Sequence, residues 1–244
     1  MNALSTPLSP EVLRQRLLDH ASAPYRAAGK FAYHFARGKL GGDPMFLALL
    51  QRGLIPDRSR ILDLGCGQGL LAAWLFAARQ LFDAGEWPAA WPAPAQMTDI
   101  RGVDMLASDI KRARSALPAP ARFELGDMRE VDFEQADVVV IMDVLHYVDI
   151  PAQEDVLRRV RDALPSGGLL LTRVGDARAG WGFQLSNWVD RTVAFFRGNR
   201  LPPLHCRPLA DWIQSLEALG FSVETTPMNG DLPFANVMLV ARLG

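Results

Sequence analysis

The stretch ILDLGCGQG, residues 61–69, decides the fold of this chain. Its apolar start predicts a short strand over residues 60–64. The strand runs into an acidic residue and three alternating glycines: Asp63, Gly65, Gly67 and Gly69. Glycine permits a tight turn and lets a ligand approach the backbone closely. Good helix formers in residues 70–82 then predict a helix, whose N-terminal amides carry positive potential toward a ligand at the turn.

Strands and helices alternate outward from this turn. We expect strands at 100–104, 122–125, 138–142 and 168–173, with helices at 108–117, capped by Ser108, and 153–164. A helix at 208–219 precedes strands 221–226 and 236–243, whose short connection favours an antiparallel hairpin. The sequence therefore predicts an α/β fold with a doubly wound, mostly parallel, seven-stranded sheet of Rossmann-like type.

We expect a single domain over residues 1–244, built around a core at 57–174 and closed by the helix and hairpin of 208–244. Residues 1–56 form an N-terminal helical cap, with helices at 11–20, where Ser9 and Pro10 suit the start, and at 44–52. The aromatic-rich stretch 175–207 is interpreted as an inserted lid, and a satellite core is the alternative. Residues 83–98, with three prolines, read as a loop.

The composition narrows the function classes. A net charge of −1 over 244 residues argues against general nucleic-acid affinity. No apolar run is long enough to span a membrane and no signal peptide is recognisable, so we expect a cytoplasmic protein. Cys66 and Cys206 are expected to be thiols, with one disulfide as the alternative, and no histidine spacing predicts a metal site.

Charge is divided unevenly along the chain. Residues 1–60 carry nine basic and four acidic residues, net +5, while residues 61–244 carry 17 and 23, net −6. This division favours either docking of the basic segment on the acidic body or an anionic ligand. A helix with a solvated basic face explains it equally well.

Further motifs follow the glycine turn in a fixed order. The turn has the spacing G-x-G-x-G, with Leu70 where the dinucleotide fingerprint requires its third glycine. After it come GVD (102–104), GDM (126–128), DVVVIMDVLHYV (137–148) and LPSGG (164–168). Over about residues 60–174 this series resembles class I S-adenosylmethionine-dependent methyltransferases. The resemblance implies S-adenosylmethionine as cofactor, bound at the turn by Asp63, Gly65, Cys66, Gly67 and Gly69.

The acids at the next two strand ends complete the expected cofactor site. A carboxylate at Asp104 suits both ribose hydroxyls, as the acid after the second strand does in nucleotide sites. The resemblance implies that Met105 neighbours the adenine, that Asp127 accepts from the adenine amino group, and that the Met128 amide contacts the ring. Asp104 and Asp127 could instead be plain turn residues.

The segment DVLHY, residues 143–147, resembles bacterial small-molecule methyltransferases and lacks the prolines of enzymes that methylate base amines. His146 is the candidate general base for an acceptor hydroxyl, with a structural histidine equally open. Asp143 positions either the cofactor amino group or its own loop. In the aromatic and basic stretch 24–40, Arg37 or Lys39 is expected to meet the cofactor carboxylate; a packing amphipathic helix is the alternative.

The stretches ARGKLGGDP (36–44), RVGDA (173–177) and LHCRPLADW (204–212) also resemble proteobacterial methyltransferases of aryl-polyene or fatty-acid-like pigment loci. This resemblance implies a small-molecule acceptor with an aryl head group, carried on an acyl carrier protein in one version. We expect methyl transfer to an apolar or aromatic acceptor, with O-methylation favoured. A non-catalytic S-adenosylmethionine-binding protein and a nicotinamide oxidoreductase are the alternatives; oligomeric state is not predicted.

Overall fold

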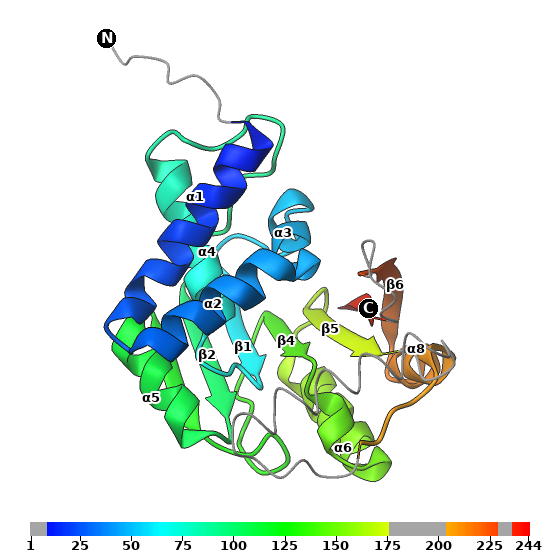
Figure 1. Ribbon diagram of the computed structural model, residues 1–244. Helices are drawn as coiled ribbons and strands as arrows, with labels where there is room; N and C mark the ends of the chain where they lie inside the picture. Colours follow the sequence, from blue (N-terminus) through cyan, green and yellow to red (C-terminus); the bar gives the residue numbers. More distant parts are fainter. Residues whose placement is uncertain (1–8, 176–203, 229–235) are drawn as a thin grey trace. The chain divides into compact units, whose positions relative to one another are not determined.

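The computed structural model describes residues 9–175, 204–228 and 236–244 (Figure 1). The chain divides into two compact units, residues 1–126 and 127–244. The expected lid, residues 175–207, lies outside the described residues except at its two ends.

The first unit opens with helices. Helix α1 spans Pro10–Ser22 and begins as predicted, because the Ser9 side chain accepts from the Val12 amide and Pro10 occupies the first turn. The 3-10 helix η1 (Ala23–Arg26), α2 (Lys30–Gly42) and α3 (Pro44–Gln51) follow. The aromatic and basic stretch, residues 24–40, is thus largely helical.

The alternating part of the first unit consists of β1 (Arg60–Leu64), α4 (Leu70–Asp83), β2 (Asp99–Asp104), α5 (Ala107–Ala116) and β3 (Ala121–Leu125). Parallel ladders join β1 to β2 and β2 to β3. Helix α1 lies against α4 (Figure 1). The side chains of Leu13, Leu17 and Ala21 are buried in α1. The N-terminal helices therefore supply part of this unit's apolar core.

Ser108 does not cap α5, so that prediction was wrong. Residue 106 is the N-cap position and no side chain bonds the helix amides there. The Asp104 carboxylate, two residues earlier, accepts from the Leu106 amide at 2.8 Å instead. Asp104 therefore holds the residue from which α5 starts, and the helix begins before Ser108.

Residues 84–98 form a loop, as the prolines predict. Two tryptophans hold it: the Trp87 ring nitrogen donates to the Pro92 carbonyl at 2.9 Å, and the Trp87 and Trp91 rings meet edge to face. The loop returns to the core through Ala95 and Met97, both buried. The long insertion before β2 is therefore packed through its aromatic side chains.

The second unit contains β4 (Val138–Met142), the 3-10 turn η2 (Leu145–Tyr147), α6 (Ile150–Ala163), β5 (Leu169–Gly175), α8 (Leu209–Ala218), β6 (Phe221–Pro227) and β7 (Asn236–Leu243). β4 and β5 pair in parallel, whereas β7 pairs antiparallel with both β5 and β6, which confirms the terminal hairpin. Helix α6 starts three residues before the predicted position, because Asp149 caps it by accepting from the Ala152 amide at 2.9 Å.

The sheet has seven strands. Their order is β3-β2-β1 within the first unit and β4-β5-β7-β6 within the second. The predicted mostly parallel α/β fold is therefore confirmed. No helix in the described part of the chain is long and apolar enough to cross a membrane.

Candidate functional site

The glycine turn after β1 has a backbone that only glycine adopts easily. Gly67 and Gly69 have φ angles of +54° and +80°. A Cβ at Gly69 would come within 2.8 Å of the Phe123 ring, so packing requires glycine there. A Cβ at Gly67 would meet nothing within 4 Å, so the turn presents open space at this residue. That open side is where a ligand can reach the backbone, which fits the cofactor that the motif implies.

Backbone amides of the turn are held by the end of β2. The amides of Gly65 and Cys66 donate to the Val103 carbonyl at 2.8 and 3.1 Å. The Gly67 amide donates to Oδ2 of Asp104 at 2.8 Å. Each carboxylate oxygen has two acceptor sites, so Asp104 keeps the capacity to accept ribose hydroxyls while it holds the turn.

Two carboxylates and a thiol share this region. Asp63 is buried, and burial together with the charge of Asp104 raises the pKa of Asp63 to about 7. Burial, and then the charge of Asp63, raise the pKa of the Cys66 thiol well above its ordinary value. Cys66 is therefore a neutral thiol rather than a nucleophile, and the structure holds no disulfide to Cys206.

The buried acid gives the first prediction. The folded-state pKa of Asp63 is raised from 3.8 to about 7, so its contribution to stability is complete below pH 3.8 and lost as pH rises through 7. We expect the cofactor-free wild type to lose a few kcal/mol of unfolding free energy from this group between pH 4 and 7. Asp63→Asn should lack that loss and be the more stable protein at pH 8. Denaturant melts at several pH values measure the difference; parallel curves for the two proteins would contradict it.

Met105, expected beside adenine, directly follows β2. Its side chain is 60% exposed. A large apolar side chain so exposed beside Asp104 suits a surface that a flat ligand covers. The expected adenine contact stays a prediction.

Arg37 is engaged elsewhere in the first unit. Its guanidinium lies 2.6 Å from Asp19 and 3.2 Å from the Ser22 hydroxyl. It also lies over the Tyr33 ring, 5.7 Å from the centroid. Contact with a cofactor carboxylate stays a prediction, and it requires Arg37 to share or exchange the Asp19 ion pair.

Asp127, the first residue of the second unit, comes two residues after the end of β3. Its carboxylate accepts from the Arg129 amide at 2.9 Å and pairs with the Arg129 guanidinium at 2.5 Å. That hydrogen bond lowers the pKa of Asp127, so the group is a charged acceptor at neutral pH. Met128 is buried, and its carbonyl accepts from Arg159 at 2.9 Å. Both residues are thus held in place, while their adenine contacts stay predictions.

Asp143 directly follows the last residue of β4 and has a left-handed φ of 57°. Arg173, at the end of β5, clamps its carboxylate: the guanidinium Nε lies 2.7 Å from Oδ1 and the terminal nitrogen bonds Oδ2. Arg173 is 5% exposed. Arg173 was not among the residues predicted for the site, although an arginine inside the apolar strand LLLTRVG signals a buried ion pair.

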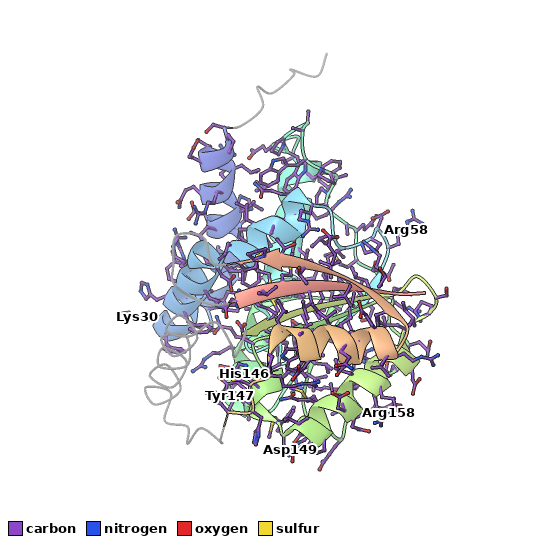
Figure 2. All side chains as sticks on the ribbon, turned by 90° about the vertical axis from the view of Figure 1, so that its right-hand side faces the viewer. Lys30, Arg58, His146, Tyr147, Asp149 and Arg158 are labelled. Atoms are coloured by element: carbon purple, nitrogen blue, oxygen red, sulfur yellow. The ribbon has the colours of Figure 1, made fainter. Side chains whose placement is uncertain are left out.

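His146 lies in η2 beside Tyr147, with ring centroids 4.3 Å apart (Figure 2). Its Nε2 atom is buried and has no hydrogen-bond partner among the residues that the structure describes. Burial lowers the pKa of His146 below 6.5, and the nearby charge of Asp143 opposes that shift. The imidazole is therefore neutral at physiological pH and presents an unused nitrogen.

The turn that carries His146 is fixed through its backbone. The His146 carbonyl accepts from the His205 amide at 2.8 Å. The buried Gln153 amide nitrogen lies 3.2, 3.0 and 2.8 Å from the carbonyl oxygens of Leu145, Val148 and His205. Gln153, another residue that sequence patterns did not reveal, thus joins the His146 turn to the segment that begins at residue 204.

Within residues 9–175, 204–228 and 236–244, no group of three histidine, cysteine or acidic side chains is placed to hold a metal ion.

Solved structures of methyltransferases share this fold. Human N-acetylserotonin methyltransferase in complex with S-adenosylmethionine aligns with 97% of this chain and 60% of its own, at a TM-score of 0.60 and 17% identity. Magnesium protoporphyrin IX methyltransferase from Synechocystis with bound S-adenosylhomocysteine aligns with 97% of this chain and all of its own, at a TM-score of 0.56 and 18% identity.

Curated relatives match only part of the chain. A trans-aconitate 2-methyltransferase of Variovorax paradoxus is 32% identical over 53% of this chain, and a carboxy-S-adenosyl-L-methionine synthase of Shewanella piezotolerans is 28% identical over 50%. The chain spans 44% and 46% of those relatives. The family model described as "Methyltransferase domain" matches residues 34–226, most of the sequence. The chain belongs to this methyltransferase-domain family, whose cofactor is S-adenosylmethionine.

Proposed function

We propose that this protein transfers the methyl group of S-adenosylmethionine to a hydroxyl oxygen of a small, largely apolar or aromatic acceptor. The observation that carries the proposal is the buried Nε2 of His146, in the turn that follows the carboxyl end of β4, which has no hydrogen-bond partner among the described residues. In open α/β sheets ligands bind at the carboxyl ends of the strands.

Bound S-adenosylmethionine supplies a methyl group that its sulfonium charge already activates. The tasks left to the protein are to hold the two reactants in line, to exclude water, and to remove one proton from an oxygen nucleophile. Alignment alone supplies roughly 7–11 kcal/mol in well-oriented systems. A general base adds about 10²–10⁴-fold.

His146 suits the role of that base. Its lowered pKa keeps the imidazole neutral and able to accept a proton at neutral pH. A buried nitrogen without a partner costs free energy, and an acceptor hydroxyl that hydrogen-bonds to Nε2 would remove that cost. Asp143 then stabilises the imidazolium that forms, because its negative charge raises the pKa of His146. The Gln153 side-chain amide and the His205 backbone amide, which bond carbonyl oxygens of the turn, keep the base in one place.

The name of one structural neighbour supports oxygen as the attacked atom. An O-methyltransferase family protein from Burkholderia thailandensis is among the structural neighbours, at a TM-score of 0.60 and 18% identity. Aromatic residues in the sequence of 176–203, namely Trp181, Phe183, Trp188, Phe195 and Phe196, favour an apolar acceptor. We assign the cofactor's ribose to Asp104 and its adenine to Met105, Asp127 and Met128.

A turnover screen tests the proposal. The protein is incubated with S-adenosylmethionine and a panel of phenols, hydroxylated aryl acids and hydroxylated aliphatic acids, with the acids supplied both free and as carrier-protein thioesters. Mass spectrometry then follows S-adenosylhomocysteine and the acceptor. Methyl ethers formed together with S-adenosylhomocysteine are the expected result. A carboxylated cofactor, or cofactor binding with no methylated product from any acceptor, would overturn it in favour of a synthase or a non-catalytic binding protein.

A further inference from the structure

The N-terminal helices make two buried polar contacts with the glycine turn. The Tyr25 hydroxyl, in η1, donates to the Gln68 carbonyl at 2.8 Å, and Tyr25 has no exposed surface. The Gln68 side-chain amide donates to the Ala32 carbonyl, in α2, at 2.9 Å. Gln68 is 1% exposed. One residue of the turn is thus bonded to two different N-terminal elements.

These bonds act on the part of the turn that carries the cofactor motif. The Gln68 carbonyl belongs to the peptide that links it to Gly69, and the amide of that same peptide donates to the Cys66 carbonyl at 2.9 Å. Burial raises the pKa of Tyr25 far above its ordinary value, so its hydroxyl is always a donor. On the other side of the turn, the Gly67 amide is fixed by Asp104. The turn is therefore held from β2 and, independently, from the N-terminal helices.

The polar contacts are not what attaches these helices. Apolar side chains of α1, among them Leu13, Leu17 and Ala21, are buried where α1 packs on α4, and burial of this kind supplies the main attraction. Gln68 also carries a penalty: its buried Oε1 has no hydrogen-bond partner among the described residues. An apolar side chain at position 68 would avoid that penalty, so packing alone does not account for glutamine here.

We infer that Tyr25 and Gln68 are positioning residues, which hold the glycine turn in its cofactor-binding conformation from the N-terminal side. Through them, the affinity for S-adenosylmethionine depends on helices outside the strand–helix alternation. This inference concerns the cofactor and does not depend on which acceptor is methylated.

Tyr25→Phe tests the inference with a minimal change. The variant leaves the Gln68 carbonyl without its hydroxyl donor, and we expect affinity for S-adenosylhomocysteine, measured by calorimetry, to fall roughly tenfold. In the cofactor-free protein, the amides of Gly67 and Gly69 should exchange with solvent faster. Once an acceptor is known, KM for S-adenosylmethionine should rise while kcat at saturation is kept.

Two further variants separate positioning from simple loss of stability. Trp74→Phe removes another buried bond between an N-terminal helix and α4, from the ring nitrogen to the Phe46 carbonyl at 2.8 Å, without touching the turn. It should lower the melting temperature at least as much as Tyr25→Phe and leave cofactor affinity unchanged. Gln68→Met, which keeps the side-chain length but removes the bond to Ala32, should weaken binding as Tyr25→Phe does.

Wild-type affinity and wild-type amide exchange in Tyr25→Phe, with only a lower melting temperature, would overturn the inference. So would an equal loss of affinity in Trp74→Phe. Both readouts need only S-adenosylhomocysteine and the protein, so a failed acceptor screen leaves the test intact.

Discussion

Replacing His146 with alanine should lower turnover by about 10²–10⁴-fold, the contribution of a positioned general base. Affinity for S-adenosylhomocysteine should stay at the wild-type value, because no proton moves when the cofactor binds. The physical reason is the buried Nε2, which has no partner within the described residues and belongs to a neutral imidazole. Steady-state kinetics and calorimetry measure the two quantities separately.

The pH profile distinguishes a base from a structural histidine. Because burial lowers the pKa of His146, the wild type should remain active below pH 6.5 and lose turnover only as pH falls through that lowered value. The acidic limb should vanish in His146→Ala. His34→Ala, which removes an exposed ring stacked edge-on against Tyr33, is the matched control and should keep both rate and profile. Unchanged turnover in His146→Ala with reduced stability would assign the histidine to structure alone.

Local sequence signals predicted the architecture well, because they act over a few residues. Alternating apolar strands and helices located the sheet, and the short connection after residue 227 predicted the antiparallel hairpin that β6 and β7 form. The capping signal at Ser9 and Pro10 was confirmed. Ser108 failed as a cap because the side chain that meets the start of α5 comes from Asp104, whose position depends on the end of β2. The Asp149 cap went unnoticed and moved the start of α6.

The candidate site divides in the same way. Acids at strand ends were visible in the sequence, since the carboxyl ends of parallel strands share one edge of a sheet. Tyr25, Gln68 and Gln153 were not visible, and the arginine within the apolar strand β5 did not by itself identify its partner Asp143. Tyr25, for example, reaches a backbone carbonyl 43 positions away, and the Arg173 ion pair spans 30 positions. Contacts from a side chain to a distant carbonyl or carboxylate leave no periodic pattern, so only the folded chain reveals them.

One residue, Leu70, distinguishes this glycine turn from the dinucleotide fingerprint of nicotinamide enzymes. Leu70 replaces the third glycine of the dinucleotide fingerprint and is buried at the start of α4. The glycine at that position in dinucleotide-binding folds allows close packing of helix on strand. Here Gly69 serves close packing instead, against Phe123. The family match agrees with this difference, and the oxidoreductase alternative falls away.

Asp104→Ala should weaken cofactor binding by about 2–4 kcal/mol, because the two ribose hydroxyls that we assign to this carboxylate would lose a charged acceptor. The sequence alone predicts little change in the stability of the cofactor-free protein. The structure changes that expectation: the two carboxylate oxygens accept from the Gly67 and Leu106 amides, both at 2.8 Å, so alanine also releases the turn and the start of α5. The melting temperature should therefore fall as well.

Asp104→Asn separates the two effects, because its single carbonyl oxygen can keep only one of the amide bonds and carries no charge. We expect an intermediate loss of affinity, together with a fall in the pKa of Asp63 toward 3.8, since the charge of Asp104 helps to raise it. Asp99→Asn is the matched control: this acid lies at the opposite end of β2 and pairs with Arg122 at 3.1 Å, so its loss should leave cofactor affinity unchanged. Calorimetric affinities equal to wild type in both Asp104 variants would reduce that residue to a turn former, and the ribose would need another acceptor.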